Sequence, residues 1–416
     1  MVQIPIAIVG AGGMGGRHLG ALGALYESGM ANVELVAVCD TREENAIHLA
    51  DNAEELLGSR PEVFTSMGEM EKKRPDIEAV DITTDSGSHH LVAEMAFELG
   101  YNVLCEKPLS LTVRGCNRVI DAWKRSGKVL SVGEQERRDP MCRLNKALLD
   151  VGAIGTPYSF LLGSARGGND IIIWPWRHYK NIGGIFVDAG VHAVDQMMYY
   201  LGDIEEVFAV SRTWEPKRYR GERIGVASFY DHWADEVPDE IDADAEDMVI
   251  STLKYKSGAV GQWTSFYAAH GEPTQYGMIY GSKGSMEPAR QRRGDPLTLT
   301  IDGGGVVTGD AVLELVPDFH LDELPTRLFG SDRLGSYDTP FEDADRFLVA
   351  FEYYELGQCI TDGTTPEVDA YVGRKDLAVC NAALESAVLG RPVTVEEIEN
   401  EETAVYEASI NAHWKI

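Results

Sequence analysis

The sequence predicts an α/β protein with an N-terminal doubly wound parallel sheet and a C-terminal α/β domain built on an open, mainly antiparallel sheet. Its 416 residues exceed what one hydrophobic core usually organises, so two domains are expected. Strand-like and helix-like segments alternate regularly over residues 1–133. In residues 134–416 longer strand-like segments appear, which suits an antiparallel or mixed sheet.

The first domain is expected to consist of strands and helices in alternation. Such alternation joins parallel strands through right-handed crossover helices, which builds a doubly wound sheet. The expected strands are residues 4–9, 33–39, 77–82, 102–105 and 129–132. The expected helices are residues 14–28, 43–57, 88–99 and 111–126.

The second domain is expected to combine long strands with a few helices. The strands are residues 156–163, 206–213, 248–255 and 260–267, and the helices are residues 140–151, 339–362 and 373–389. Between two of these strands, residues 215–247 carry many acidic residues, prolines and glycines. We interpret them as a long excursion that serves as a lid or as an oligomer contact.

The charge balance argues against nucleic acid as a partner. Asp and Glu number 67 against 37 Lys and Arg, which gives a formal net charge of −30. An acidic surface repels phosphate backbones, and it is explained by solubility or by adaptation to salt. No segment approaches the roughly 20 uninterrupted apolar residues that cross a bilayer, so no membrane contact is expected.

The cysteines and the start of the chain indicate a cytoplasmic enzyme. Six cysteines are scattered without C-x-x-C spacing, which signals neither a zinc site nor a disulfide framework, and no other metal site is indicated. The first residues lead directly into a strand, without the basic, apolar and small-residue regions of a secretion signal. We therefore expect reduced, mostly buried thiols and a cytoplasmic location.

A glycine-rich turn after the first strand predicts a dinucleotide site. Gly10, Gly12 and Gly15 form G-x-G-x-x-G between a strand and a helix, the context that this motif requires. Gly10 permits the tight turn, Gly12 lets the backbone approach a pyrophosphate, and Gly15 allows close helix packing. Because the helix amino terminus adds amide donors, the turn with Gly13 and Met14 is expected to hold the cofactor in a Rossmann domain.

The end of the second strand distinguishes the two nicotinamide dinucleotides. Asp40 is placed to accept hydrogen bonds from the adenosine ribose hydroxyls, which favours NAD. Arg42, two residues further on, can instead pair with the 2′-phosphate of NADP. We expect Asp40, Thr41 and Arg42 to contact the cofactor, with NAD preferred and NADP as the alternative.

A lysine stands where the strand over residues 102–105 ends. Glu106, Lys107 and Pro108 lie at the carboxyl edge of the parallel sheet, where ligands of doubly wound folds bind. The ammonium group can hold a substrate oxygen and stabilise alkoxide character, and burial beside the cofactor would lower its pKa. Pro108 fixes the chain, and a cis Lys107–Pro108 peptide would aim the lysine side chain.

Asp188 and His192 are further catalytic candidates. With Asp195 they stand at spacings of four and three residues, so on a helix they share one face. An imidazole of near-neutral pKa can take the hydroxyl proton as hydride leaves, and a carboxylate one turn away can orient the ring. An exposed Asp/His pair or a helix cap would explain the same residues without catalysis.

These segments together resemble the glucose-fructose oxidoreductase / inositol dehydrogenase (Gfo/Idh/MocA) family over most of the chain. The family's first-domain pattern is similar to Thr84, His89 and the 105–108 segment, and its D-x-x-x-H-x-x-D pattern is similar to residues 188–195. Two departures are Asp85-Ser86, where the family usually has Pro-Asn, and Arg138, where an aromatic residue is common.

The resemblance implies roles for the matching residues. Lys107, Asp188 and His192 would be the catalytic group. The second-domain sheet would lie with one face over the nicotinamide, and the other face would join copies into a homodimer or homotetramer. The residues of the first-domain pattern would contact the cofactor, namely Thr83, Thr84, His89, Glu106 and Lys107.

The residues before the catalytic helix are candidates for substrate binding. Residues 166–180 combine tryptophans with hydrogen-bonding side chains, a mixture that suits carbohydrates because C–H faces pack on indole. Packing of the loop against the core would explain the tryptophans equally well. We expect Arg166, Trp176 and His178 to contact the substrate, together with Lys107, Asp188 and His192.

The expected reaction is oxidation of a secondary hydroxyl of a sugar, polyol or glycoside by hydride transfer to a nicotinamide. An alternative is an NAD-dependent glycoside hydrolase or lyase, in which the substrate is transiently oxidised and the cofactor is recycled. The two differ in stoichiometry, because only the dehydrogenase accumulates reduced cofactor. A third interpretation is a nucleotide-sensing protein, which would bind the cofactor without turnover.

Overall fold

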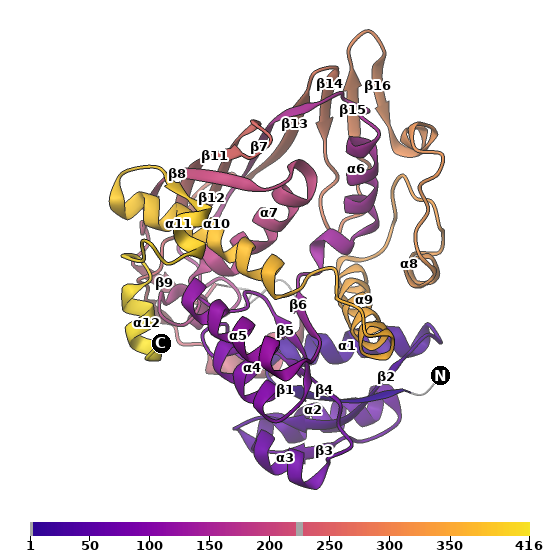
Figure 1. Ribbon diagram of the computed structural model, residues 1–416, viewed down its shortest axis with the longest axis vertical. Coiled ribbons are helices and arrows are strands. Elements are labelled where there is room, and N and C mark those ends of the chain that lie inside the picture. Colours follow the sequence, from indigo (N-terminus) through magenta and orange to yellow (C-terminus); the bar gives the residue numbers. More distant parts are fainter. Residues whose placement is uncertain (1–2, 222–227) are drawn as a thin grey trace.

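The computed structural model describes residues 3–221 and 228–416, which form two large sheets flanked by helices and one small two-stranded sheet (Figure 1). The first sheet has six strands in the order β3-β2-β1-β4-β5-β6, all of them paired in parallel. This order confirms the predicted doubly wound class. The strands are β1 (Ile4–Val9), β2 (Val33–Cys39), β3 (Glu62–Phe64), β4 (Ala79–Ile82), β5 (Asn102–Glu106) and β6 (Leu130–Gly133). The helices between them are α1 (Gly13–Glu27), α2 (Glu43–Leu57), α3 (Met67–Lys73), α4 (His89–Glu98) and α5 (Val113–Ser126).

The local sequence explains where these elements begin and end. Every residue of β5 is buried, as expected for a parallel strand covered on both faces. α2 ends at Gly58 with a φ of 78°, and α5 ends at Gly127 with a φ of 66°, a left-handed conformation that glycine adopts without strain. α5 begins at Thr112, whose side chain accepts a hydrogen bond from the Gly115 backbone.

The second sheet has nine strands in the order β16-β15-β14-β13-β7-β12-β11-β8-β17. β7 and β12 are parallel, whereas the other neighbouring strands are antiparallel. The sheet is therefore open and mainly antiparallel, as predicted. Its strands are β7 (Pro157–Gly167), β8 (Ile204–Arg212), β11 (Met248–Tyr255), β12 (Val260–Ala269), β13 (Thr274–Gly281), β14 (Gly284–Glu287), β15 (Thr298–Ile301), β16 (Gly305–Thr308) and β17 (Val393–Thr394).

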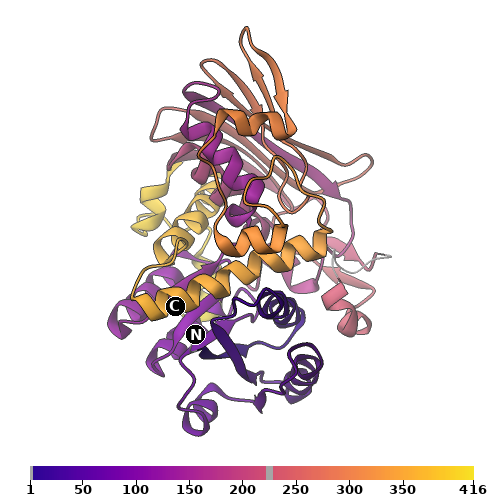
Figure 2. The same cartoon turned by 90° about the vertical axis from the view of Figure 1, so that its right-hand side faces the viewer.

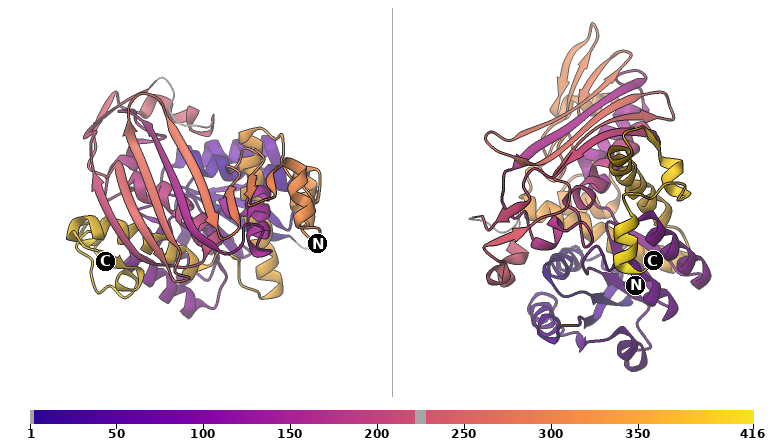
Figure 3. Two further views of the ribbon diagram at one scale, coloured as in Figure 1. Left: turned by 90° about the horizontal axis from the view of Figure 1, so that it is seen from above. Right: turned by 90° about the vertical axis from the view of Figure 1, so that its left-hand side faces the viewer.

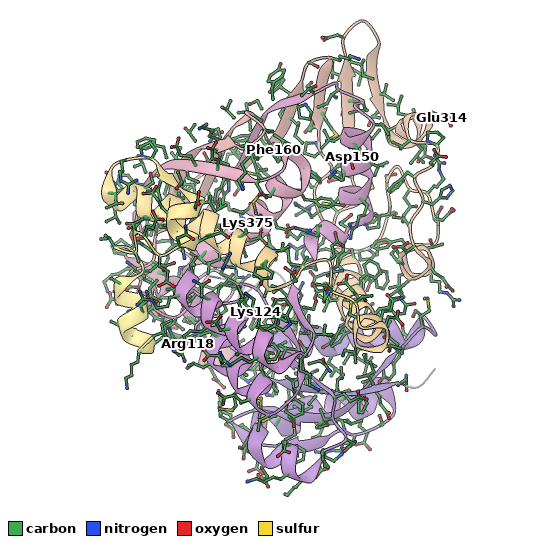
Figure 4. The ribbon with its side chains drawn as sticks, in the orientation of Figure 1. Arg118, Lys124, Asp150, Phe160, Glu314 and Lys375 are labelled. Atoms are coloured by element: carbon green, nitrogen blue, oxygen red, sulfur yellow. The ribbon has the colours of Figure 1, made fainter. Side chains whose placement is uncertain are left out.

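Helices cover one face of this second sheet. α7 (Ile185–Leu201) and α10 (Ala370–Leu389) lie against the strands and pack on each other, and α6 (Pro140–Asp150) packs beside α7. Phe160 of β7 lies between the sheet and the helices (Figure 4) and is fully buried. Its ring centroid lies 6.2 Å from that of Tyr200 on α7. The catalytic candidates on α7 are thus held by a well-packed layer.

The opposite face of the second sheet is open in the part of the chain that the structure describes. Seen from above, its strands face the viewer and the helices lie behind them (Figure 3). Along β11 the buried Val249, Ser251 and Leu253 alternate with outward-facing residues such as Ile250. The large hydrophobic side chains exposed on this outer face are Phe208, Val210, Ile250, Val260, Tyr276 and Tyr280.

The two domains are joined by more than their connecting chain. α9 (Phe341–Asp362) belongs to the C-terminal part of the sequence, yet it packs along α1 of the first domain (Figure 2). Leu348 and Phe351 of α9 share a hydrophobic core with Leu22 and Leu25 of α1. The remaining helices are α8 (Glu323–Phe329), α11 (Val395–Glu399) and α12 (Ala408–Trp414).

The excursion predicted between two strands leaves the sheet after β8 and returns at β11. Its strands β9 (Lys217–Tyr219) and β10 (Glu240–Asp242) pair antiparallel, and the 3-10 helix η3 (Ser228–Glu236) lies against α1. Residues 222–227 of the excursion lie outside the described residues. The contact of η3 with α1 of the same chain favours a lid over an oligomer contact for this part of the excursion.

The cysteines agree with the expectation from their spacing. All six are free and buried: Cys39, Cys105, Cys116, Cys142, Cys359 and Cys380. Burial raises the pKa of several of these thiols, that of Cys39 to about 12, so they stay protonated near neutral pH. Among the described helices, none has the length and apolar character needed to cross a membrane.

Candidate active site

Two adjoining cavities lie between the domains. The larger, about 660 Å³, follows the carboxyl ends of β1, β2 and β4 and is lined by the glycine-rich turn. The smaller, about 350 Å³, lies between Lys107 of the first domain and α7 of the second. Met14, Thr84, Trp176 and Tyr230 line both cavities, so a ligand in one reaches the other. The arrangement offers separate places for a cofactor and a substrate that meet at these four residues.

The surroundings of each glycine of the motif are compatible with the role that the sequence predicts for it. A Cβ on Gly10, whose φ is 104°, would lie 2.7 Å from the Thr83 and Thr84 backbone. A Cβ on Gly15 would lie 2.4 Å from the Gly10 carbonyl oxygen, so α1 approaches β1 as closely as only glycine allows. Gly12 has no atom within 4 Å of its Cβ position, which leaves its backbone open to the cavity.

The larger cavity fits a dinucleotide. No side chain caps the amino terminus of α1, so its first backbone N–H groups are available to a pyrophosphate. Asp40 lines the adenosine end, where its carboxylate accepts hydrogen bonds from the backbone N–H groups of Ala11 (2.7 Å) and Arg42 (2.8 Å). These bonds fix the carboxylate at the cavity edge, beside Thr41. Cavity size and donor set both suit NAD.

The loop after β4 also borders the cavities. Thr83 lines the cofactor cavity, and its hydroxyl donates to the Gly10 carbonyl at 2.6 Å. His89 is buried and lines the smaller cavity. Its ring nitrogens face the carbonyl oxygens of Pro108 (2.8 Å) and Thr84 (3.1 Å). His89 therefore ties the Thr84 loop to the turn that carries Lys107.

Glu106 lies beneath Lys107 at the wall of the smaller cavity. Its carboxylate accepts a hydrogen bond from the Lys107 backbone at 3.0 Å and lies 2.9 Å from His18 Nε2. Burial opposes ionisation of Glu106, but the hydrogen bond with His18 and the positive charges of His18 and Arg17 hold its pKa well below the usual range. Glu106 therefore stays ionised, and its carboxylate holds the backbone of Lys107 in place.

Lys107 reaches across the domain boundary. The Lys107–Pro108 peptide is cis, as anticipated from the sequence, and the lysine side chain is only 8% exposed. Its ammonium donates to the backbone oxygen of Asp188 at 2.9 Å and to Oδ1 of the same residue at 3.1 Å. The ammonium carries three N–H bonds, so one donor is left for a further oxygen atom in the cavity.

Asp188 is held by two cations. Besides Lys107, the guanidinium of Arg177 pairs with its Oδ2. Burial alone would raise the pKa of Asp188, but the charges of Arg177 and Lys107 lower it overall, so the carboxylate is ionised. Asp188 therefore positions Lys107 and Arg177, and it is not the group against the His192 ring.

His192 is oriented by Glu134. Its Nδ1 lies 2.7 Å from the carboxylate of Glu134, whereas the sequence had suggested Asp188 for this role. Burial lowers the pKa of His192 to about 4, with help from the charge of Lys107. Burial likewise raises the pKa of Glu134 to about 7, although Lys107 opposes the rise. The ring is thus neutral near neutral pH, and a proton on Nδ1 leaves Nε2 free to accept one.

The third residue of the helical pattern lies elsewhere. Asp195 is fully buried and binds Nε of Arg137 at 2.9 Å, so it belongs to a buried ion pair behind the site. Of the expected substrate contacts, Arg166 and Trp176 do line the smaller cavity.

His178 must be corrected. Its ring is 1% exposed, it lines neither cavity, and its Nε2 accepts a hydrogen bond from the Ile172 backbone at 2.9 Å. Burial and the nearby charges of Arg218 and Arg177 lower its pKa to about 3, so the ring is neutral. His178 therefore holds the loop together and does not face the substrate cavity.

Several residues at the site were not singled out in the sequence. Glu134 and Arg177 hold the catalytic candidates, and Tyr230 of the excursion lines both cavities. A run of cations between β14 and β15 lines the smaller cavity, namely Arg290, Arg292 and Arg293. In so acidic a chain, a run of arginines is a sequence feature that could have indicated a binding site. No sequence feature indicates Glu134 or Tyr230, because their contacts are made only in the folded chain.

Two profiles of one enzyme family match this chain. The profile described as "Oxidoreductase family, NAD-binding Rossmann fold" matches residues 4–134. The profile of the "GFO/IDH/MocA C-terminal domain" matches residues 143–287. Together they cover most of the chain. The first spans the six-stranded sheet, and the second spans β7 to β14 of the nine-stranded sheet.

Several curated relatives are named as dehydrogenases. Levoglucosan dehydrogenase of Pseudarthrobacter phenanthrenivorans is 31% identical over 228 residues, which are 53% of this chain and 57% of that protein. D-apiose dehydrogenase of Paraburkholderia graminis is 25% identical over 415 residues, 98% of this chain and 93% of the relative. Myo-inositol 2-dehydrogenase of Thermotoga maritima is 27% identical over 314 residues, 74% of this chain and 84% of that enzyme.

A solved structure resembles the whole chain. Levoglucosan dehydrogenase in complex with NADH and L-sorbose superposes with a TM-score of 0.74 at 25% identity, over 95% of this chain and 100% of the other. Fold, cofactor cavity and profile matches therefore agree. The chain belongs to the Gfo/Idh/MocA family of oxidoreductases, and its first domain is the NAD-binding Rossmann domain of that family.

Proposed function

We propose that this protein is an NAD-dependent dehydrogenase that oxidises a secondary hydroxyl group of a sugar, polyol or glycoside. One observation carries the proposal: Lys107 from the first domain and His192 from the second line the same cavity, next to the one that fits the dinucleotide. The relatives named for levoglucosan, D-apiose and myo-inositol support the substrate class.

Lys107 would hold the oxygen of the hydroxyl group. Two of its N–H bonds are directed to Asp188, which fixes the ammonium and leaves the third for the substrate. A positive charge at that place stabilises the negative charge that develops on the oxygen as its proton departs. Arg177 neutralises the second carboxylate oxygen of Asp188, so Asp188 does not compete for the substrate hydroxyl as an acceptor.

His192 would remove the hydroxyl proton. Its neutral ring can accept a proton at Nε2 while Nδ1–H donates to Glu134. The resulting imidazolium would be stabilised by the carboxylate of Glu134, 2.7 Å from Nδ1. Bound NAD supplies the hydride acceptor, and the chain supplies binding, orientation and the proton path.

The lining of the smaller cavity suits a hydroxylated ligand. Trp176 offers an aromatic face at the junction of the two cavities. Arg166 offers a cation, and hydroxyl and amide side chains complete the wall with Ser164, Ser265 and Gln275. A few polar groups on a partly apolar wall are typical of sites that orient small polar substrates.

The test is a spectrophotometric screen of sugars, polyols and glycosides with NAD and NADP in parallel. Formation of reduced nicotinamide in step with an oxidised product is expected for at least one neutral sugar or polyol. Release of an aglycone without net reduction would instead identify the hydrolase or lyase that recycles its cofactor. Binding of NADH without turnover of any compound would contradict the dehydrogenase proposal.

We also propose that copies associate through the outer face of the second sheet as a homodimer or homotetramer. Val210, Ile250 and Tyr276 lie in one row across neighbouring strands and are all exposed. Thr264 and Gly163 lie between Ile250 and Tyr276 in this row. Several exposed apolar side chains on one face of a sheet are typical of an interface between subunits. Light scattering after gel filtration should give the mass of an oligomer, and Ile250→Asp should reduce it to that of the single chain.

A further inference from the structure

We propose that η3, residues Ser228–Glu236, is a cap that slows the release of bound NAD and discriminates against NADP through Glu236. The cap belongs to the second domain, yet it lies beside α1 of the first domain (Figure 2). Its residues Tyr230, Trp233 and Glu236 line the cofactor cavity. The inference rests on NAD binding by the Rossmann domain and does not depend on which substrate is oxidised.

The base of the cap is fixed to the second domain. Arg218 is fully buried, and its guanidinium donates to the carbonyl oxygens of Gly168 (3.1 Å) and Tyr267 (3.0 Å) and to the carboxylate of Asp247 (2.9 Å). A small hydrophobic core joins the returning half of the excursion to the loop before α7, formed by Ile171, Val237 and Ile241. These contacts hold the segments next to the cap in a fixed place on the second domain.

Tyr230 closes the cavity over the glycine-rich turn. A Cβ on Gly13 would lie 2.4 Å from the Tyr230 ring, so the phenol rests directly on the turn that holds the pyrophosphate. Trp174 stacks on this ring, with centroids 5.5 Å apart and planes 22° from parallel. Tyr230 is only 8% exposed. A dinucleotide bound in the cavity would thus be covered at its centre by two stacked aromatic rings.

The next residues attach the cap to α2. Trp233 is 7% exposed, and its indole N–H donates to Oδ1 of Asn45 at 3.1 Å. His232 stacks on His48 with ring centroids 3.8 Å apart. Because α2 follows Asp40 in the chain, these contacts close the adenosine side of the cavity. Release of the cofactor then requires the cap and α2 to separate.

Glu236 pairs with Arg42, the arginine beside Asp40 that could recognise NADP. Both guanidinium nitrogens of Arg42 lie 3.1 Å from its carboxylate oxygens, a bidentate pair between the two domains. Glu44 also contacts Arg42 at 3.1 Å, and the Asp40 carboxylate lies close by on the same turn. A 2′-phosphate would have to displace Glu236 from Arg42 and remain next to these carboxylates. Because Glu236 already binds Arg42, this arginine is not free for the 2′-phosphate of NADP, and Asp40 sets the preference for NAD.

The selectivity is tested with Glu236→Gln, which keeps the size of the side chain and removes its charge. The matched control is Glu240→Gln, on the same excursion, where the glutamate pairs with Lys217 and does not line the cavity. Dissociation constants are measured by titration calorimetry with NADH and with NADPH. We expect Glu236→Gln to strengthen NADPH binding about tenfold and to leave NADH within about twofold, as for removal of one like-charge contact. Unchanged NADPH affinity would overturn the role of Glu236.

The closure is tested by the rate of NADH release in stopped-flow fluorescence. Trp233→Ala should accelerate release about tenfold or more, because most differences in affinity at one site appear in the dissociation rate. Trp214→Ala, at an exposed tryptophan of the same excursion, serves as the control and should not change the rate. Trp233→Phe keeps a ring but loses the hydrogen bond to Asn45, so it tests the contact if the alanine variant is poorly folded. Release at the parent rate in both Trp233 variants would overturn the cap.

Neither experiment uses a substrate. A protein that oxidises no sugar but releases NADH faster after Trp233→Ala would disprove the proposed dehydrogenase and support the cap. A protein that oxidises a sugar but releases NADH at the same rate in the Trp233 variants would support the dehydrogenase and disprove the cap. The two proposals therefore fail separately.

Discussion

Nδ1 of His192 lies 2.7 Å from both carboxylate oxygens of Glu134, a residue 58 positions earlier in the chain. The Glu134 side chain is buried and that of His192 is 14% exposed, so the pair exchanges its proton in a largely shielded site of low dielectric. Which of the two holds that proton decides whether Nε2 of the ring can act as a base. The relationship therefore predicts how the reaction depends on pH.

Oxidation should be lost as the pH falls through about 7, where burial places the pKa of Glu134. Above that pH the carboxylate accepts Nδ1–H and leaves Nε2 of His192 free to take a proton. Below it, the protonated carboxyl donates to Nδ1, and the ring then carries its proton on Nε2. The pKa of His192, lowered to about 4, adds a second loss only in acid. The pH profile of kcat/KM for alcohol oxidation measures the transition, because kcat/KM reports groups of the free enzyme.

The control for this pH effect is Glu134→Gln, which cannot ionise. We expect kcat to drop by about 10- to 100-fold, part of what a general base contributes, and the transition near neutral pH to disappear. The dissociation constant of NADH should stay the same, because Glu134 does not line the cofactor cavity. A variant that keeps the parent transition would show that another group titrates.

Lys107→Met should remove at least about 100-fold of kcat, since one charged donor at the developing oxyanion is lost. Asp188 would keep its ion pair with Arg177, so the fold of the site should survive the change. NADH binding measured by fluorescence is expected to be near that of the parent. Lys72→Met, at an exposed position of α3, is the matched control. Retained turnover in Lys107→Met would remove this lysine from the mechanism.

Asp40→Asn should weaken the preference for NAD. The change removes the charge that faces the ribose hydroxyls and keeps the side chain nearly the same size. The ratio of the dissociation constants of NADPH and NADH is expected to fall by about tenfold, mostly through weaker NADH binding. Calorimetric titration with both cofactors gives the ratio directly, and an unaltered value would argue against a ribose contact.

Arg166→Ala should raise KM and leave kcat nearly unchanged. The side chain lines the smaller cavity on β7, and no ion pair holds it within the described residues. It is therefore available to bind the substrate. Such a contact stabilises the bound substrate and the transition state equally, so its loss changes KM and not kcat. We expect KM to increase about tenfold for the preferred sugar, as for loss of one charge-assisted hydrogen bond. A fall in kcat with constant KM would point to a different role.

The fold was predictable where the apolar segments are long and bounded by turn residues. The bounds of β1, β2, α2 and β11 agree with the predicted ones. In each, the pattern of apolar residues is long enough to identify the element, and turn residues mark both of its ends. β3, α3 and the hairpin strands β14 to β16 were missed. Each has at most seven residues, too few to show either periodicity.

The site was predictable where residues are linked by a motif. Lys107, Asp188 and His192 lie around one cavity, as their motifs suggested. Glu134 was missed because its partner is far away in the sequence, and a spacing pattern reveals only neighbours on one helix or strand. His178 was misjudged for the opposite reason: it sits among residues with binding character, but its ring is turned into the loop. Tertiary packing decides both cases.

The close approach of α1 to β1 gives a prediction about stability. A Cβ on Gly15 would lie 2.4 Å from the Gly10 carbonyl oxygen, so Gly15→Ala must push the helix away from the strand. We expect a loss of about 1–3 kcal/mol of unfolding free energy, the usual cost of overpacking, together with weaker NADH binding. Gly20→Ala on the same helix meets no atom within 4 Å and should instead stabilise the protein by up to about 1 kcal/mol. Urea unfolding of both variants compares the two signs, and equal effects would contradict the steric explanation.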